Sequence, residues 1–204
     1  MLDSLAGTVI PVVRTDSRAS AELAVEWLRA AGVRTFELTL TTPDVIASIA
    51  QLARSAELTI GAGTVMDVAA LEAVVAAGAE FVVSPILNAA LVERANALGV
   101  PCICGALTPS EIAQAVHSGA SAVKVFPVNA VGGASYIKSV RDVFPDVRFI
   151  PTGGIKVEQI ADYLAAGAFA VGVGGELVNR SALASGNRDA IQAAARAALA
   201  ATAL

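Results

Sequence analysis

The chain has 204 residues, a length that suits one domain with a sizeable hydrophobic core. Hydrophobic residues make up 55% of it and charged residues only 16%, so the composition excludes an intrinsically disordered chain. The formal net charge is -4 and no Lys/Arg cluster occurs, which argues against a nucleic-acid-binding protein.

One phrase recurs along the chain: a helical stretch ends in Ala-Gly or a similar turn, and a short apolar run follows. The glycine suits the left-handed residue that ends a helix, and the apolar run is typical of a buried strand. The predicted strands are residues 8–13, 33–40, 57–61, 79–84, 100–104, 121–126, 147–151 and 169–173. The predicted helices are residues 21–31, 43–55, 67–77, 88–98, 109–118, 134–144, 156–166 and 187–201.

Eight strands that alternate with helices, without a linker, favour a (β/α)8 TIM barrel, an α/β fold that forms a single domain over residues 1–204. A doubly wound open sheet is the alternative, but its dinucleotide-binding fingerprint is missing. Residues 61–66 and 172–177 both lack the third glycine of G-x-G-x-x-G. In a barrel, functional side chains are expected at the carboxyl ends of the strands.

The sequence predicts neither an export signal nor a membrane span. Residues 1–16 hold no basic segment and only a short apolar run that ends at Arg14, which is not the pattern of a signal peptide. Gly, Pro or charge interrupts every long apolar stretch within the length of a spanning helix. Cys102 and Cys104, the only cysteines, lie too close on one strand for a disulfide, so we expect two buried thiols in a cytoplasmic protein.

Two strands place a charged residue at a position that faces into the predicted barrel. Glu37 alternates with Phe36 and Leu38, which suit packing against the surrounding helices. Lys124 alternates in the same way with two valines of the sixth strand. A buried ion pair without chemistry is the simpler interpretation, but such a pair stabilises a fold poorly, because desolvation can exceed the attraction.

A lysine and a glutamate inside a barrel suit Schiff-base chemistry. Burial favours the neutral amine over the ammonium, and a neutral amine can attack a ketone. A nearby carboxylate can move the protons that this reaction requires. The combination indicates class I aldol chemistry, which needs no metal and no other cofactor. His117, the only histidine, offers no metal site by itself.

Other strand ends offer groups that could bind a substrate. Arg14 ends the first strand, where it could hold a carboxylate or a phosphate. Thr64 follows two glycines after the third strand, and Pro85 follows the fourth. Glycine-rich turns follow the seventh and eighth strands, where many barrels hold a phosphate on backbone N–H groups and a helix N-terminus.

Six motifs occur in one order: FELTL (36–40), GAGTV (61–65), VVSP (82–85), VKVFP (123–127), PTGGI (151–155) and GVGGELV (172–178). Through them, the chain from about residue 5 to its C-terminal helix resembles the 2-keto-3-deoxy-6-phosphogluconate (KDPG) aldolases. It also resembles their phosphogalactonate and 4-hydroxy-2-oxoglutarate (KHG) relatives. This resemblance implies a homotrimeric (β/α)8 barrel that cleaves KDPG to pyruvate and glyceraldehyde 3-phosphate.

The resemblance also implies roles for individual residues. Lys124 of VKVFP would be the Schiff-base lysine, and Glu37 of FELTL the general acid and base. Thr64 and Pro85 would bind the pyruvate end, together with Arg14. The residues implied at the distal and phosphate end are Thr152, Gly153, Gly154, Gly174 and Gly175.

Two departures from the family pattern bear on the substrate. Thr41 stands where some members have an arginine after the second strand, whereas Arg14 matches members with an arginine after the first. Gly175 stands where many members offer a serine to the phosphate, and Glu176 follows it. The alternatives are therefore the phosphogalactonate epimer, 4-hydroxy-2-oxoglutarate or a non-phosphorylated 2-keto-3-deoxy acid. A non-catalytic binding or assembly module is a further alternative, which the presence of both Lys124 and Glu37 argues against.

Overall fold

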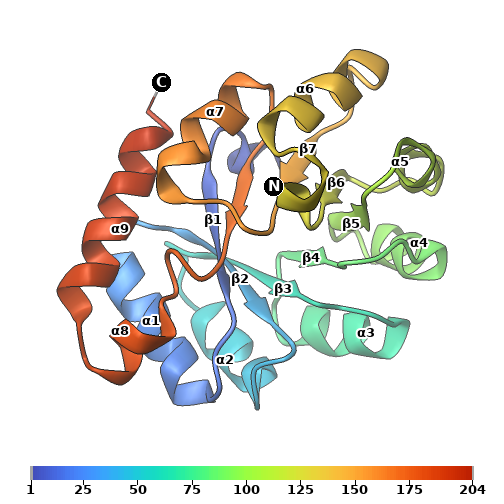
Figure 1. Cartoon of the computed structure of the whole chain (residues 1–204). Helices are drawn as coiled ribbons and strands as arrows, with labels where there is room; N and C mark the ends of the chain where they lie inside the picture. The colour runs from blue at the N-terminus through green and yellow to red at the C-terminus, as the bar shows by residue number, and fades with distance from the viewer. Residues whose placement is uncertain (1, 204) are drawn as a thin grey trace.

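The computed structural model describes residues 2–203, in which eight parallel strands form a nearly closed barrel with helices around it (Figure 1). Each strand overlaps one of the eight apolar runs, so the predicted fold class is confirmed. The strands are β1 (Val9–Val13), β2 (Thr35–Thr39), β3 (Thr59–Gly63), β4 (Phe81–Val83), β5 (Cys102–Ala106), β6 (Ala122–Val125), β7 (Phe149–Pro151) and β8 (Val171–Val173).

Two strands end two residues further along the chain than predicted, and both contain glycines near these ends. We expected strands at 57–61 and 100–104, whereas β3 ends at Gly63 and β5 at Ala106. Gly61, at the predicted end of β3, and Gly105, just beyond the predicted end of β5, both lie within the strands. A methyl group on Gly61 would overlap the ring of Phe81, which fills the barrel interior beside it. These glycines let the interior side chains and a neighbouring loop approach the strand backbone.

From β1 to β7, each strand pairs in parallel with its neighbour along the chain, and β1 also pairs with β8. The ring closes between β7 and β8 through a single isolated bridge, which joins Thr152 to Gly172. Parallel pairing brings the carboxyl ends of all strands to one end of the barrel. The loops that follow the strands therefore surround one common opening.

Helices lie outside the barrel, one after nearly every strand, as predicted (Figure 1). Side chains at the N-caps start several of them; Thr108 and Glu111, for example, form a capping box at one helix. The helices are α1 (Arg18–Ala30), α2 (Val45–Leu52), α3 (Val68–Ala76), α4 (Ala89–Ala97), α5 (Pro109–His117), α6 (Ala134–Val143), α7 (Ile160–Ala165), α8 (Arg180–Ala184) and α9 (Arg188–Ala201). Short 3-10 helices occupy Leu2–Leu5, Val128–Val131 and Val157–Gln159. The sequence did not predict α8, because five residues are too few to show helical periodicity.

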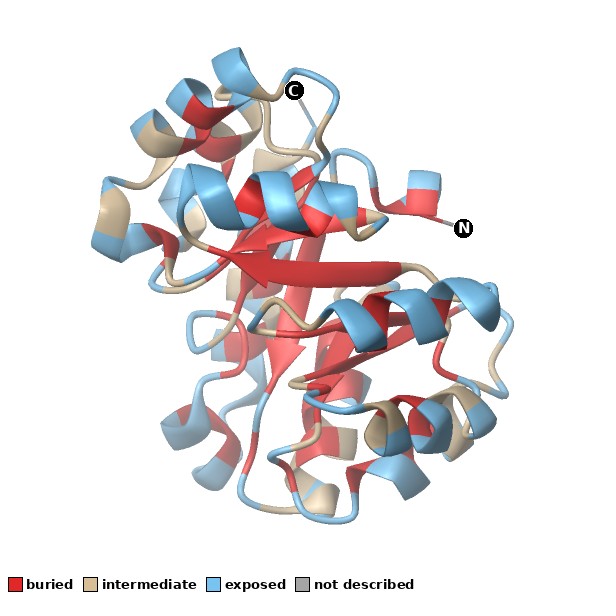
Figure 2. Ribbon diagram, turned by 90° about the vertical axis from the view of Figure 1, so that its right-hand side faces the viewer, coloured by how far each residue is buried: buried red, intermediate tan, exposed pale blue. Residues whose placement is uncertain are grey.

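The strands separate two layers of apolar side chains. Figure 2 shows the strands as the buried centre of the molecule. Phe36 and Leu38 pack in the outer layer, against the helices. Phe81, Ile103 and Ala122 pack in the inner layer, where the N-terminal 3-10 helix joins them through its leucines. The alternation predicted for β2 and β6 is therefore confirmed, and it leaves the other face of each strand directed inward.

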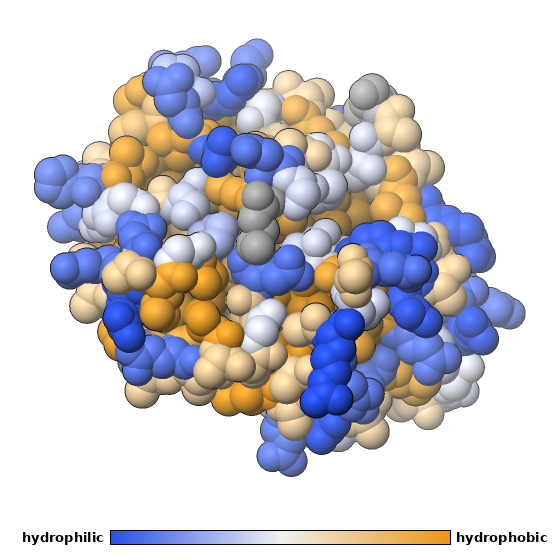
Figure 3. Space-filling view, turned by 180° about the vertical axis from the view of Figure 1, so that it is seen from behind, coloured by the Kyte–Doolittle hydropathy of each residue, from blue (hydrophilic) through white to orange (hydrophobic). Residues whose placement is uncertain are grey.

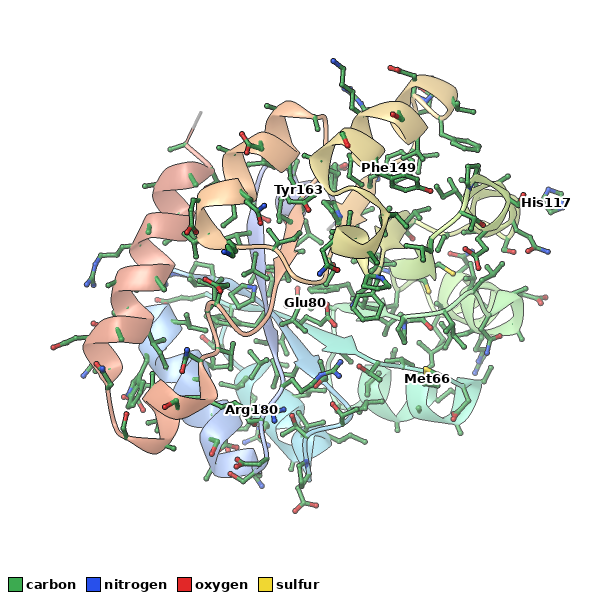
Figure 4. The ribbon with its side chains drawn as sticks, viewed as in Figure 1. Met66, Glu80, His117, Phe149, Tyr163 and Arg180 are labelled. Carbon is green, nitrogen blue, oxygen red and sulfur yellow. The ribbon has the colours of Figure 1, made fainter. Side chains whose placement is uncertain are left out.

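The surface behind the barrel is mixed, with hydrophilic side chains among smaller apolar patches (Figure 3). None of the described helices is both long enough and apolar enough to cross a bilayer. Within residues 2–203, no group of three or more His, Cys, Asp and Glu side chains is placed to hold a metal ion. His117 lies at the end of α5, on the outside of the barrel (Figure 4).

Candidate active site

Lys124 and Glu37 meet inside the barrel. The side-chain nitrogen of Lys124 lies 3.3 Å from Oε1 of Glu37 and donates a hydrogen bond to it. The two residues come from β6 and β2, and only 4% and 3% of their surfaces are exposed. The structure therefore brings together the two residues that strand alternation predicted to point inward.

Gly63 makes room for the carboxylate of Glu37. Gly63 ends β3 and pairs with Thr39 of β2, so it lies beside the strand that carries Glu37. A methyl group on Gly63 would overlap Oε1 of Glu37 and would lie 2.6 Å from its Cγ. Any larger side chain at this position would displace the carboxylate, so the glycine helps to fix where the acid lies.

Phe126 connects the buried lysine to the surface. Its ring centroid lies 5.5 Å from Nζ of Lys124, a distance at which an aromatic face attracts a cation. Phe126 is 37% exposed and lines a pocket of about 520 Å³. The pocket lies at the carboxyl ends of β1, β6, β7 and β8, which is where a barrel places its functional groups.

Six of the predicted binding residues line this pocket: Arg14, Thr152, Gly153, Gly154, Gly174 and Gly175. Gly153 and Gly154 have φ values of 101° and 70°, which glycine adopts without steric cost. Gly174 and Gly175 border open space, because a Cβ atom on either would meet nothing within 4 Å. The structure thus gathers the predicted distal residues around one cavity.

Arg14 connects the pocket to Thr64, a predicted residue outside it. Nη2 of Arg14 donates a hydrogen bond of 3.4 Å to Oγ1 of Thr64. Thr64 follows Gly63 directly and has a φ of 60°. A β-branched residue in this left-handed region is an outlier, and such strained backbone occurs preferentially at functional sites.

Pro85 lies beside β5, the strand next to the one that carries Lys124. Gly105 of β5 pairs with Lys124 of β6, and a methyl group on Gly105 would overlap the carbonyl of Pro85. Neither Pro85 nor Thr64 lines the 520 Å³ pocket, so the predicted residues fall into a pocket group and a group at the ends of β3 and β4. Thr41, at the position of the family arginine, pairs its hydroxyl with that of Thr39 at 3.0 Å.

The pocket also includes residues that the sequence analysis did not single out. Lys156 follows the glycine turn after β7, and Arg180 is the first residue of α8; both line the pocket. The signal available in the sequence was a cation shortly after each glycine-rich turn. It was missed because residues around 180 have no strand or helix periodicity that would place them.

The two thiols lie outside the site. Cys102 and Cys104 are unpaired and buried in the outer layer, between β5 and its helices. Burial raises the pKa of Cys102 to about 12, with a smaller contribution from Cys104. The prediction of two buried thiols is confirmed, and neither thiol faces the Lys124–Glu37 pair.

Comparison with known proteins identifies the family of the chain. A family model described as KDPG and KHG aldolase matches residues 4–194. The 2-dehydro-3-deoxy-phosphogluconate aldolase of Dickeya dadantii is 38% identical over 96% of this chain and 92% of its own length. The KHG/KDPG aldolase of Escherichia coli is 36% identical over 93% of this chain and 90% of its own length.

Solved structures give the same result. KDPG aldolase from Legionella pneumophila, with pyruvate captured as a covalent carbinolamine intermediate, superposes with a TM-score of 0.88 at 32% identity. The match covers 97% of this chain and 96% of the Legionella chain. On the family model, the relatives and the fold together, this chain belongs to the KDPG and KHG aldolase family of class I aldolases.

Proposed function

We propose that the protein cleaves KDPG to pyruvate and glyceraldehyde 3-phosphate through a Schiff base on Lys124, with Glu37 as general acid and base. The observation that carries this proposal is the pair itself. Nζ of Lys124 lies 3.3 Å from the Glu37 carboxylate, both residues are buried, and Phe126 links them to the pocket. A lysine so placed has a proton acceptor within hydrogen-bond reach.

The first step forms the covalent intermediate. Glu37 accepts a proton from Lys124, and the neutral amine attacks the C2 ketone of the substrate. A proton from Glu37 then converts the carbinolamine hydroxyl to water, which leaves as the iminium forms. The nitrogen lone pair replaces the C–O bond, so the step involves no oxidation or reduction.

The second step breaks the carbon–carbon bond. The Glu37 carboxylate removes the proton of the C4 hydroxyl, and the C3–C4 bonding electrons move to the iminium and form an enamine. The aldehyde departs. Glu37 then returns its proton to C3, and water hydrolyses the resulting iminium, which releases pyruvate and the free amine of Lys124.

We assign the binding groups to two ends of the substrate. Arg14, held to Thr64 at 3.4 Å, suits the carboxylate of the pyruvate half, with Pro85 on the same side. The glycine turns at 153–154 and 174–175, together with Thr152, suit the distal half of the substrate. Exposed backbone N–H groups in such turns can hold an anion.

Trapping with borohydride tests the mechanism. Pyruvate and borohydride together are expected to leave a stable adduct on the peptide that contains Lys124, seen by mass spectrometry. The Lys124→Ala variant, otherwise folded, is expected to take up no label and to release no pyruvate from KDPG. An unmodified Lys124 in the parent protein would contradict the mechanism. Pyruvate release by the parent protein but not by the variant would also rule out a non-catalytic module.

One observation favours a second candidate substrate. Gly175 supplies no hydroxyl and Glu176 places a carboxylate on the pocket wall, which suits a non-phosphorylated 2-keto-3-deoxy acid. The phosphogalactonate epimer and 4-hydroxy-2-oxoglutarate would react by the same steps. Values of kcat/KM for the four substrates decide between them, because discrimination is a ratio of these constants.

We also propose that the protein is a cytoplasmic homotrimer whose partners are its small-molecule 2-keto acid substrates, not nucleic acid or membrane. Large apolar side chains that remain exposed support an assembly of copies: Ile46 is 39% exposed, Met66 43% and Ile86 45%. Met66 and Ile86 follow β3 and β4, and the Asn88 side chain joins their two loops. Sedimentation equilibrium at the mass of one chain would contradict this proposal.

A further inference from the structure

We propose that Lys156 and Arg180 act as a cationic clamp for the phosphate at the distal end of the substrate, and so determine which aldehyde the enzyme prefers. This inference rests on the proposed aldolase function and deepens it. Together, Lys156 and Arg180 form the distal clamp.

The two residues follow the glycine-rich turns after β7 and β8. Lys156 comes directly after the turn at Gly153, Gly154 and Ile155, where β7 leads into a 3-10 helix. Arg180 starts α8 and follows the turn after β8, whose Gly174, Gly175 and Glu176 also line the pocket (Figure 4). Both side chains line the same cavity as Phe126, whose ring lies 5.5 Å from Nζ of Lys124. The distal clamp and Phe126, which contacts the reacting amine, therefore border one pocket.

The charge of the pocket is opposite to that of the whole chain. Three cations line it, Arg14, Lys156 and Arg180, against one carboxylate, Glu176. The chain as a whole has a net charge of -4. A cleft of positive charge on an acidic protein concentrates anionic ligands and repels cations. The pocket is thus suited to a substrate that carries negative charge at both ends.

Both cations of the distal clamp are available to a ligand. Among residues 2–203, the ion pairs join Arg18 to Glu22, Arg94 to Glu72, Lys124 to Glu37 and Arg148 to Asp3. None of these pairs includes Lys156 or Arg180, and both residues are exposed. A phosphate that binds between them would not have to displace a carboxylate partner.

The distal clamp can replace the serine hydroxyl that this chain lacks at Gly175. Gly175 provides only its backbone, and a Cβ atom there would meet nothing within 4 Å, so no neighbouring side chain fills the place of a hydroxyl. A guanidinium and an ammonium supply charge-assisted hydrogen bonds to phosphate oxygens, which are stronger than a bond from a neutral hydroxyl. The structure thus offers two charges where the family pattern offers one hydroxyl.

Aldol synthesis with a fixed donor and three acceptor aldehydes tests the clamp. Pyruvate is combined with glyceraldehyde 3-phosphate, glyceraldehyde or glyoxylate, and kcat/KM is measured for each aldehyde. The parent protein is expected to prefer glyceraldehyde 3-phosphate to glyceraldehyde. In the K156Q/R180Q variant that preference is expected to fall about 100-fold, the loss of two charge-assisted hydrogen bonds of ordinary strength.

A matched control separates the clamp from overall charge. Lys138 on α6 and Arg196 on α9 are exposed and lie outside the pocket, so K138Q/R196Q makes the same change in net charge. This variant is expected to keep the parent preference. Glu176→Gln is expected to shift the preference in the opposite direction, about two- to threefold toward the phosphorylated aldehyde, because it removes a like charge.

Three outcomes would overturn the clamp: a parent protein without preference for the phosphorylated aldehyde, an equal loss in K138Q/R196Q, or a K156Q/R180Q variant whose largest loss is with glyoxylate. The last result would show that the distal group is a carboxylate. Borohydride trapping of pyruvate on Lys124, run on each variant, keeps this test apart from that of the proposed function. If trapping succeeds and the parent protein shows no preference for the phosphorylated aldehyde, only the clamp is wrong; if trapping fails in the parent protein, the aldolase mechanism itself is wrong.

Discussion

The side chains of Lys124 and Glu37 meet at 3.3 Å across the barrel interior, although 87 residues separate them in the chain. The pair is buried, and a buried pair whose partner is removed leaves an uncompensated charge. A substitution at this pair therefore changes the charge balance of the barrel interior. Glu37→Gln is the most informative substitution, because it changes the charge and almost nothing of the shape.

Glu37→Gln is expected to retain the fold and to lower kcat by about 10²- to 10⁴-fold, the usual contribution of a general acid and base. The amide keeps the volume of the acid but cannot move protons. Steady-state kinetics on KDPG measures the loss, and circular dichroism checks the fold. Glu57→Gln, an exposed acid, is the matched control and should leave kcat unchanged. Equal activity of the two variants would remove Glu37 from the mechanism.

Gly63→Ala is expected to impair both activity and stability. Its added methyl group would overlap the Glu37 carboxylate, and overpacking of this kind costs about 1–3 kcal/mol. Gly63 does not have a positive φ, so the cost is one of space rather than backbone strain. A fall in kcat and in Tm is the expected result. If kcat were retained, the position of the carboxylate would not depend on this glycine.

The buried thiols are expected to be unreactive in the folded protein. Burial raises the pKa of Cys102 to about 12 from 9.0 and raises that of Cys104 as well, so both remain protonated near neutral pH. A thiolate is the reactive form. A disulfide reagent at pH 8 should modify neither thiol natively and both in guanidinium. Fast modification without denaturant would contradict the burial of β5.

The Cys102 thiol should also contribute to the pH dependence of stability. A group whose pKa is higher in the folded state stabilises the fold below its unfolded pKa, and that contribution is lost as pH rises. For Cys102 the loss falls between pH 9 and pH 12. The free energy of unfolding of Cys102→Ala should therefore decline less over this range than that of the parent protein. Parallel decline in the two proteins would contradict the prediction.

The capping box of α5 should contribute to the pH dependence of stability in the acid range. Hydrogen bonds from the backbone N–H of Leu107, the backbone N–H of Thr108 and the Thr108 hydroxyl hold the pKa of Glu111 below its usual 4.5. Stability from a lowered pKa is complete above the unfolded pKa and is lost as pH falls through the folded one. Glu111→Gln should thus be less stable than the parent at pH 7, with the difference shrinking below pH 4.5.

A neutral cap provides the comparison for Glu111. Thr108→Ala removes the N-cap hydroxyl of the same helix, a change that typically costs about 1 kcal/mol. Chemical denaturation at pH 7 measures this cost. If Glu111→Gln matched the parent protein at pH 7, the hydrogen bonds to its carboxylate would be without consequence for folding.

The sequence predicts most of the barrel because its signals are local and periodic. Alternation with a period of two places Glu37 and Lys124 on the inner face without any knowledge of the other strands. The ends of β3 and β5 were harder to predict, because Gly63 and Gly105 lie beyond the predicted ends and belong to strands for a reason that lies elsewhere. Their missing side chains leave room for Glu37 and the Pro85 loop, which are distant in sequence.

The two cations of the pocket, Lys156 and Arg180, could not be predicted for a different reason. Lys156 lies in a loop and Arg180 begins α8, which is only five residues long, so neither has a periodic pattern that fixes its direction. Which loops border one cavity depends on the closure of the ring between β7, β8 and β1. That closure is a property of the whole sheet and cannot be predicted from one segment. The resemblance to a family predicts positions only for residues that the family shares.

The isolated bridge between Thr152 and Gly172 is the weakest strand pairing in the barrel. Around the rest of the ring, neighbouring strands share ladders of two to five paired residues, whereas β7 and β8 share this bridge and a hydrogen bond from Phe169 to Phe149. Thr152 also lines the pocket. Strand pairing is thus weakest beside a residue that lines the pocket, whereas β2 and β6, which carry Glu37 and Lys124, each form ladders with both neighbouring strands.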